Sequence, residues 1–561
     1  MKRQLSALLA LTLLLLWPAA ALADAGSEPD WTEYDRLIKA SKAGTDFLAR
    51  EDMLHQAEEM LMHTGAVLPL YYGNSVFLQR GTVSGVYNDL FGTTYFHRAE
   101  VEGSDTLHVN LGSEPGRLDP AVMVSQEEAE HLVAAFSGLY RRTADGHPQP
   151  DLATGYEMSE DGLTYTFTLR EGLKWSDGTK LDAHDFEYSW KRAADPQTGA
   201  GYSYMFSVIK GYPTDLAVTA SEDGRTLTVE LNQPCAYFLG LAAFPCAFAV
   251  PKGAVESAPN AELNPGSWTG DAGFVCSGPF MLTRWQHDEY MEYVKNPNFW
   301  DAENVKLEKI VVMLSSDATA VYNAYLAGDL ELITTIPSDE LTPLKQSPEL
   351  HTQDLLSTQF IAFNVKSHLF DGMTVEQASA MRRAFAVLID RDFIIDTVAQ
   401  CGQKEANCFV PDSMSDGNGG FFKTSDANYT YPVTAHLVTG EPEEGYYTLE
   451  VDVPGAIALL KEAGFQFDGD KLSAATPISF EYLTRNVPSD AATAECVQQD
   501  LAAVGIEMTI RTCENKEYLA EMVAGRFDLV GIQWGADFND PINMLEMWTS
   551  TSGNNICFLG R

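Results

Sequence analysis

The stretch Ser159-Glu-Asp-Gly-Leu-Thr-Tyr-Thr-Phe-Thr-Leu-Arg-Glu-Gly-Leu-Lys-Trp-Ser-Asp-Gly178 decides the fold of this chain. In its centre, apolar residues alternate with threonines, which is the pattern of a strand that buries one face. The Asp-Gly pairs on both sides of this segment predict tight turns. Similar short strands and turns continue through residues 138–250, with a helix predicted at 184–193. This part of the chain is therefore predicted to be a unit rich in short strands.

Further along the chain, strands and helices alternate. Helices are predicted at 375–390, 453–464, 490–503 and 515–524, and strands at 360–364, 480–483 and 505–510. Alternation of this kind is typical of an α/β lobe. Near the start, residues 33–63 predict two more helices, and a buried strand is predicted at 66–72.

Several separate segments carry a family resemblance. They are residues 145–153, 159–178, 185–192, 277–280, 295–300 and 382–391, and the loop Trp534-Gly-Ala-Asp-Phe-Asn-Asp-Pro541. Together they resemble the extracytoplasmic solute-binding proteins of family 5, the oligopeptide-binding proteins of peptide ABC importers. The resemblance covers nearly everything from residue 31 to residue 561. It implies an α/β fold of the type II periplasmic-binding class, with two lobes, a hinge and an extra inserted subdomain.

The order of the segments differs from the order in that family. Residues 31–72 resemble the family's closing segment, yet they precede residues 107–120, which resemble its first strand. We interpret this order as a circular permutation, because new ends in exposed loops are tolerated and termini often lie close together. Two other origins are considered. A duplication would leave a second copy of the segment, which the sequence lacks, and a remnant of a fused gene would leave the body without its own closing segment.

The resemblance also divides the chain into parts. Residues 1–23 form a signal peptide, with a basic start, an apolar core and a small-x-small cleavage signal. Residues 31–66 supply helices that complete the second lobe, and residues 353–561 form the rest of that lobe. The first lobe is formed by 67–137, with the permuted join near 100–106, and by 251–352, with 138–250 as the inserted subdomain. Two chain crossings, near 66–72 and 350–356, form the hinge.

The composition limits the partners and the compartment. The chain has 79 acidic residues against 37 basic ones, which argues against nucleic acid or an anionic membrane surface as a partner. Single cores stop growing near ~250–300 residues, so a chain of this length needs two or three lobes. No cysteine stands directly after the predicted cleavage site, where Asp24 would begin the mature chain, so no lipid anchor is expected. We expect a monomer in the periplasm or another extracytoplasmic space.

The eight cysteines leave the disulfide pattern open. The preferred pair is Cys401 with Cys408, which flank a short polar loop. Cys235 and Cys246 either pair or simply pack. No Cys-x-x-Cys sequence is present, so neither a zinc site nor a redox site is expected. We predict no metal and no cofactor.

The resemblance places the amino end of a peptide ligand at Asp537. A closing cleft strips water from an ammonium group, and only an opposite charge with good hydrogen bonds offsets that cost. The alternative is a carboxylate that caps the following turn, because Asp-Phe-Asn-Asp-Pro is also turn chemistry. We favour the binding role for Asp537 and a structural role for Asn539 and Asp540.

Other candidate ligand contacts are less specific. They are Trp534, Tyr71, Tyr202 and Tyr204 as aromatic pocket walls, Glu114 as a partner for a basic side chain, and Phe363 and Asn364 as a strand edge that binds peptide backbone. The alternatives are core packing for Tyr202 and Tyr204, hinge packing for Tyr71 and an exposed turn for Glu114.

The chain departs from the family at the positions that bind the carboxylate end of the peptide in other members. Arginines that help to hold the peptide carboxylate in enteric members correspond to Met522 and Gly531 here, and Arg526 lies at neither place. A disulfide that members often carry is absent, because its positions correspond to Thr358 and Gly535. Recognition of the carboxylate end and of peptide length is therefore open.

The sequence predicts a binding protein and not an enzyme. It has no His-Glu-x-x-His, no Gly-x-Ser-x-Gly and no P-loop. We expect an extracytoplasmic subunit of an ABC importer that captures short peptides by cleft closure and delivers them to a membrane permease. The alternatives are a relative that binds a nickel chelate, haem or an oligosaccharide, a peptide sensor or chaperone-like holder without transport, and a secreted hydrolase.

Overall fold

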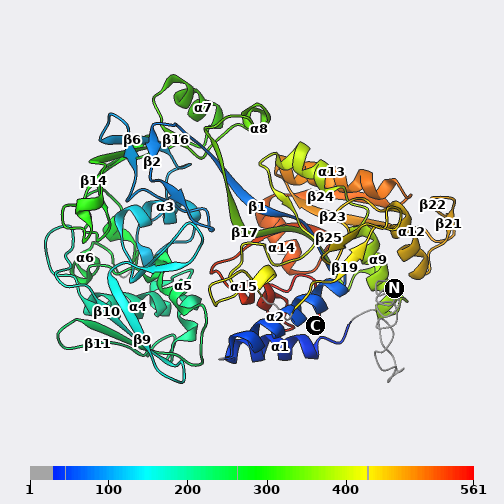
Figure 1. Ribbon diagram of the computed structural model, residues 1–561, viewed down its shortest axis with the longest axis horizontal. Coiled ribbons are helices and arrows are strands. Elements are labelled where there is room, and N and C mark those ends of the chain that lie inside the picture. Colours follow the sequence, from blue (N-terminus) through cyan, green and yellow to red (C-terminus); the bar gives the residue numbers. More distant parts are fainter. Residues whose placement is uncertain (1–28, 45, 262, 426–428) are drawn as a thin grey trace, which may run out of the picture.

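The computed structural model describes residues 29–44, 46–261, 263–425 and 429–561. The predicted signal peptide, residues 1–23, lies outside the described residues. Two bodies are joined by two long strands, β1 (Val67–Gln79) and β17 (Leu350–Phe363), as Figure 1 shows. These strands lie in the middle of one sheet with the order β13-β14-β15-β6-β16-β1-β17-β25-β23-β24. The two lobes therefore share a sheet at their junction.

The hinge lies where β1 and β17 lose their regular pairing. Tyr72 pairs with Thr358 and Asn74 pairs with Asp354, so three residues of β17 face the single residue Gly73. A Cβ atom on Gly73 would lie 2.0 Å from the Ser357 hydroxyl oxygen, which explains a glycine at this close approach. The irregular register falls at Gly73 and at residues 355–357, beside the chain crossings predicted near 66–72 and 350–356.

Lobe 1 holds the left part of the sheet in Figure 1. Its central strand β6 (Thr106–Asn110) runs parallel to both β15 (Lys309–Met313) and β16 (Leu332–Ile333). The hairpin of β13 (Phe280–Gln286) and β14 (Tyr290–Lys295) extends the sheet outward. Two smaller elements of this lobe matter below: the strand β7 (Tyr140–Arg142) and the helix α3 (Gln126–Ala135).

The strand-rich stretch forms a separate four-stranded antiparallel sheet with the order β11-β12-β10-β9. Its strands are β9 (Ala153–Met158), β10 (Thr164–Leu169), β11 (Val218–Ala220) and β12 (Thr226–Glu230). The apolar residues of β10 are buried and its threonines are half-buried, as the alternation predicts. The helix α4 (Ala183–Ala194) begins with the Asp182 capping box and buries Trp190 at 1% exposure.

Lobe 2 continues the main sheet beyond β17. The strand β25 (Leu529–Gly535) pairs antiparallel with β17, and β23 (Ser479–Arg485) and β24 (Glu507–Cys513) follow in parallel. The helices of this lobe include α9 (Val375–Ala386), α12 (Val453–Glu462), α13 (Pro488–Ala502), α14 (Asn515–Val523) and α15 (Pro541–Leu545). No helix in the described part of the chain is long and apolar enough to cross a membrane.

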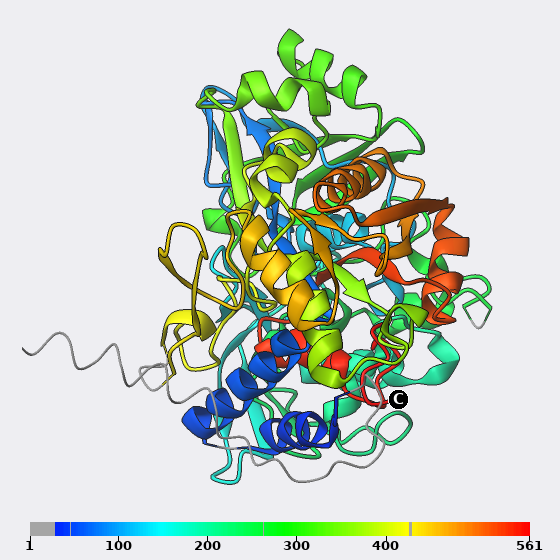
Figure 2. The same ribbon diagram turned by 90° about the vertical axis from the view of Figure 1, so that its right-hand side faces the viewer.

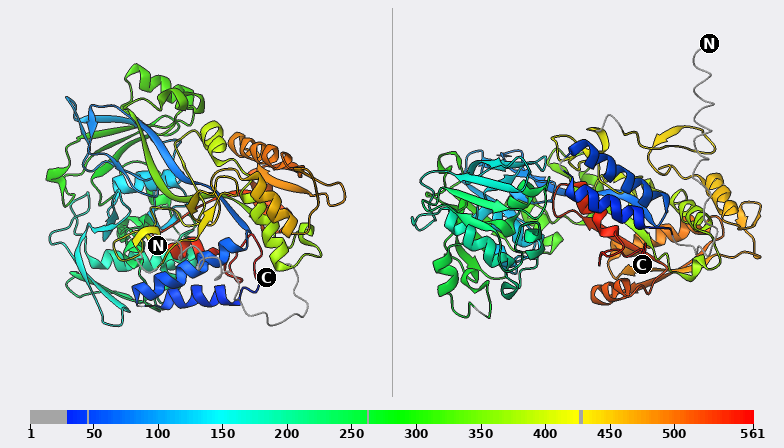
Figure 3. Two further views of the ribbon diagram at one scale, coloured as in Figure 1. Left: turned by 45° about the vertical axis from the view of Figure 1, so that its right-hand side comes forward. Right: turned by 90° about the horizontal axis from the view of Figure 1, so that it is seen from below.

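The N-terminal helices α1 (Thr32–Ala43) and α2 (Phe47–His63) pack on lobe 2, beside the last segment of the chain (Figures 2 and 3). The Trp31 indole donates to the Trp548 carbonyl oxygen at 2.7 Å, and the Tyr34 hydroxyl donates to the Leu545 carbonyl oxygen at 2.7 Å. The first and the last described segments of the chain therefore build one core.

The two described ends also touch directly. A Cβ atom on Gly560 would lie 2.6 Å from the Cβ atom of Trp31, and the Ser550 amide donates to the Asp35 carboxylate at 2.9 Å. The C-terminus lies next to α1 in Figure 1. This proximity is what a permuted chain requires, and the permuted order itself stays a prediction.

A chain rebuilt in the segment order of the family tests the predicted circular permutation. A chain that starts at Ser104, runs to Arg561 and continues through a short Gly-Ser linker into residues 30–103 should fold with nearly unchanged thermal midpoint. The reason is that its new break falls in an exposed turn and its new joint bridges ends already in contact. Circular dichroism and thermal unfolding measure the outcome.

A matched deletion of residues 24–66 should leave insoluble protein. It would remove six large buried side chains, each of which stabilises the fold by about 1.5–3 kcal/mol through burial. The summed loss is comparable to the ~5–15 kcal/mol stability of a typical domain. These side chains are Trp31, Tyr34, Leu37, Ile38, Leu54 and Leu61. A soluble, ligand-competent deletion variant, or a rejoined chain that fails to fold, would refute the permutation account.

Candidate functional site

A short loop after β25 carries Asp537 to the space between the lobes. The loop is fixed by its neighbours, since the Asp537 amide donates to the Asn543 side chain at 3.2 Å and the Ala536 amide donates to the Leu356 carbonyl oxygen at 2.7 Å. Asp540 caps α15 by accepting the Ile542 amide at 3.0 Å. The sheet edge at which the parallel strands of lobe 2 end is the usual place for a ligand site in α/β folds.

Asp537 is contacted by two side chains from the other lobe. The Tyr204 hydroxyl, on the 3-10 turn Ser203–Val208, donates to Asp537 Oδ2 at 2.5 Å. Arg142 Nη2 donates to the Asp537 carbonyl oxygen at 3.0 Å. Burial raises the pKa of the half-buried Asp537 carboxyl, and the Tyr204 hydrogen bond and the Arg142 charge oppose that rise.

Two cavities flank this loop. The first, of about 90 Å³, is lined by Asp537, Arg142, Phe91, Met123, Ser125, Gln126, Ala129, Tyr202, Phe244, Pro245 and Ala536. The second, of about 160 Å³, is lined among others by Arg142, Phe91, Tyr237 and Phe538, and by Asn539 and Asp540 of the loop. Tyr237 from lobe 1 stacks on Phe538 from lobe 2 at 4.2 Å between ring centres. The acid thus faces apolar walls contributed by both lobes.

A buried ion pair anchors the loop to the N-terminal helices. Arg50 on α2 contacts Asp540 Oδ1 at 2.5 Å, and the two side chains are 4% and 0% exposed. Arg50 Nε also donates to the Ser41 carbonyl oxygen at 3.1 Å, at the end of α1. The structural role predicted for Asp540 is therefore to cap a helix and to hold the N-terminal segment.

The profile of the bacterial extracellular solute-binding proteins, family 5, middle part, matches residues 147–556. The chain belongs to this family. It is 30% identical over 477 residues to the oligopeptide-binding protein OppA of Bacillus subtilis, covering 82% of this chain and 80% of OppA. It is 29% identical over 461 residues to the probable deoxycholate-binding periplasmic protein YgiS of Escherichia coli, covering 80% and 78%.

A solved structure supports the same assignment. The unliganded open form of the periplasmic murein tripeptide-binding protein MppA of Escherichia coli is similar with 26% identity and a TM-score of 0.65, over 82% of this chain and 84% of MppA. The family and the two-lobed α/β fold predicted from the sequence are thereby confirmed.

The structure brings three of the predicted aromatic residues near the lobe junction. Tyr204 contacts Asp537 directly, and Tyr202 lines the smaller cavity with its ring 4.8 Å from that of Phe244. Trp534 lies on β25 just before the loop and is half-buried. Tyr71 lies in the hinge region of β1, where burial raises the pKa of its hydroxyl to about 12.

Three other predicted contacts are engaged elsewhere. Phe363 is fully buried in lobe 2, and Asn364 donates to the carbonyl oxygens of Gly525 and Phe527 at 3.0 and 3.1 Å. The predicted strand edge is wrong, because β17 is paired on both sides by β1 and β25. Glu114 accepts from the Asp288 amide at 2.5 Å and contacts His287, so it fixes a turn of lobe 1.

The predicted Cys401–Cys408 disulfide is wrong, because both of these described cysteines are free. Between them, β18 (Lys404–Glu405) adds to β1 opposite Tyr71 and Tyr72.

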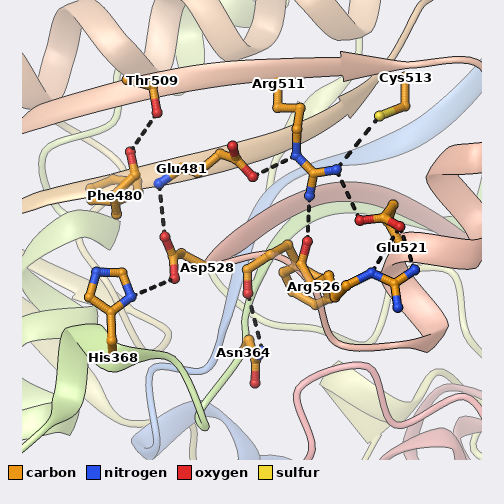
Figure 4. A network of polar contacts seen from close by, with 11 residues as sticks. Asn364, His368, Phe480, Glu481, Thr509, Arg511, Cys513, Glu521, Arg526 and Asp528 are labelled. Atoms are coloured by element: carbon orange, nitrogen blue, oxygen red, sulfur yellow. Dashed lines mark hydrogen bonds and ion pairs between the residues drawn. The ribbon is translucent and has the colours of Figure 1, made fainter.

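Arg526 lies far from the Asp537 loop. It precedes β25, whereas Asp537 follows the same seven-residue strand. Figure 4 shows Arg526 and Arg511 sharing Glu521, while Asp528 accepts the Glu481 amide at 2.9 Å. This network fixes the start of β25 and supplies no cation to the Asp537 loop.

Arg142 is a residue of the candidate site that was not predicted from the sequence. Arg141 and Arg142 both follow Tyr140 in a short strand, and the alternation of a strand turns only one of them inward. Nothing in the local sequence shows that the inward side faces another lobe.

The ion pair between Arg50 and Asp540 predicts a large stability difference between two arginine variants. Arg50→Met should lower the free energy of unfolding by about 3–5 kcal/mol, because it leaves a buried carboxylate without its partner. Arg36→Met is the matched control on α1. Its pair with Glu33 has side chains 58% and 52% exposed, and such pairs contribute about 0–1 kcal/mol. Urea unfolding measures both, and equal losses would contradict the anchoring role.

Proposed function

We propose that this protein is the extracytoplasmic binding subunit of an ABC importer and captures short peptides by their amino end. The observation that carries the proposal is Asp537, a half-buried carboxylate between the lobes whose side chain accepts a hydrogen bond from Tyr204 of the opposite lobe. The similarity to an oligopeptide-binding protein and to a murein tripeptide-binding protein supports a peptide as the ligand.

The chemistry of the loop suits a primary ammonium group. An ammonium in a closing cleft loses water on all sides, and a carboxylate with raised proton affinity gains most from a fixed positive charge. Tyr204 supplies a second oxygen beside Asp537, so the ammonium has two acceptors from two lobes. Binding there links the lobes through the ligand.

Cleft closure follows from this arrangement. A ligand shifts the protein toward the closed state only by its additional contacts in that state. A ligand can contact Asp537 of lobe 2 together with Tyr202 and Tyr204 of lobe 1 only when the two lobes have approached each other. We propose that the closed form then docks on a membrane permease, after export directed by residues 1–23. YgiS and MppA are periplasmic by name, which supports the same compartment here.

A bile-acid ligand is the second candidate, because the chain is also similar to a probable deoxycholate-binding protein. Deoxycholate carries a carboxylate and no cation. A half-buried acid at the lobe junction disfavours that anion, so the peptide is preferred. Binding of deoxycholate but of no peptide would reverse this preference.

Asp537→Asn tests the proposal. The amide keeps the shape and still accepts the Tyr204 hydrogen bond, but it carries no charge to pair with an ammonium. Affinity for a pool of tri- to pentapeptides, measured by isothermal titration calorimetry, should fall by about 2–5 kcal/mol, at least thirtyfold. The thermal midpoint of the unliganded protein should change little.

Asp470→Asn is the control, since Asp470 lies exposed in a turn of the same lobe. It should leave affinity unchanged. Unchanged affinity in Asp537→Asn, or a large loss of unliganded stability, would show that Asp537 is structural.

A further inference from the structure

Arg142 is a buried cation beside the candidate ammonium site. Its side chain is 5% exposed and lies with its guanidinium carbon 3.6 Å from the centre of the Phe91 ring and 4.9 Å from that of Phe244. Nη2 donates to the Asp537 carbonyl oxygen at 3.0 Å, and Nη1 lies 3.9 Å from Asp89 Oδ2. The guanidinium is therefore held between two aromatic rings, the Asp89 carboxylate and the Asp537 carbonyl oxygen.

The charges around this guanidinium are nearly balanced. Asp89 is fully buried and accepts the amides of Phe91 and Thr93 at 2.9 Å each. With both acids ionised, Asp89, Asp537 and Arg142 carry one net negative charge. One ammonium group makes this set neutral, and a second positive charge makes it positive.

The guanidinium also lines both cavities that flank the Asp537 loop. A peptide whose ammonium meets Asp537 has its first side chain within a few bonds of that point. Whichever of the two cavities receives this side chain, Arg142 forms part of the wall. In a compartment closed from water, two cations repel far more strongly than in solution.

We propose that Arg142 is a specificity-determining residue that selects against peptides with a positively charged first side chain. The inference rests on the proposed function, because it takes Asp537 as the ammonium partner. The substrate class is thereby narrowed to peptides whose first residue is neutral or acidic. The selection comes from repulsion of the wrong ligand and needs no additional contact to the right one.

The test compares two tripeptides of matched side-chain length, norleucyl-alanyl-alanine and lysyl-alanyl-alanine, on the full mature protein by isothermal titration calorimetry. The norleucyl peptide should bind at least tenfold more tightly. In Arg142→Met the ratio of the two affinities should fall below threefold or reverse. The reason is that the repelling guanidinium is gone and Asp89 then lacks its cation. Arg142→Lys keeps a positive charge at this position, so it should keep the discrimination that Arg142→Met loses.

Arg141→Met is the matched control. Arg141 is the neighbouring residue of the same strand, and its guanidinium lies 3.9 Å from Asp151 Oδ1, on a different acid. Its variant should keep the tenfold ratio. A merely structural role of Arg142 would weaken both tripeptides equally and leave the ratio unchanged.

The outcomes separate this inference from the proposed function. Equal binding of both tripeptides by the unaltered protein overturns the role of Arg142 and leaves the role of Asp537 standing. If neither tripeptide binds, and pentapeptides with the same first residues also fail, both proposals are overturned. Retained discrimination in a folded Arg142→Met protein overturns this inference alone.

Discussion

The buried ion pair between Arg50 and Asp540 joins the start of the chain to its end. Asp540 belongs to the loop that carries Asp537. Arg50 belongs to α2, a helix of lobe 2 that precedes every strand of the sheet in the sequence. Two charges this deeply buried are stable only while they face one another. The geometry of the ligand loop therefore depends on α1 and α2 packing where they do, beside Leu545 and Trp548.

Function follows from where the sheet places that loop. Because β25 runs parallel to β23 and ends at the lobe junction, its last residues are presented to the opposite lobe. Tyr204 and Arg142 reach the loop from lobe 1, and we propose that the lobes move about the irregular pairing at Gly73. A ligand that replaces or bridges these contacts changes the balance between open and closed forms, which is how a binding protein reports its occupancy.

Much of this was predictable from local sequence. Alternation in β10 and helical spacing in α13 follow directly from burial of one face. The motif of the Asp537 loop pointed to the family, and the binding role of Asp537 stays a proposal. The failures concern long-range pairing. Nothing near Phe363 shows that β17 has neighbours on both sides, nothing near Cys401 shows that β18 joins β1, and Arg142 is inward only because another lobe covers it.

The most direct test of the central claim is the affinity of one peptide in two chemical forms. Alanyl-alanyl-alanine with a free amino end should bind at least thirtyfold more tightly than its N-acetylated form, because acetylation removes the charge that Asp537 neutralises. Isothermal titration calorimetry on the mature protein gives both dissociation constants. Equal affinities for the two forms would contradict the account, since the amino end would then not be what the lobes hold.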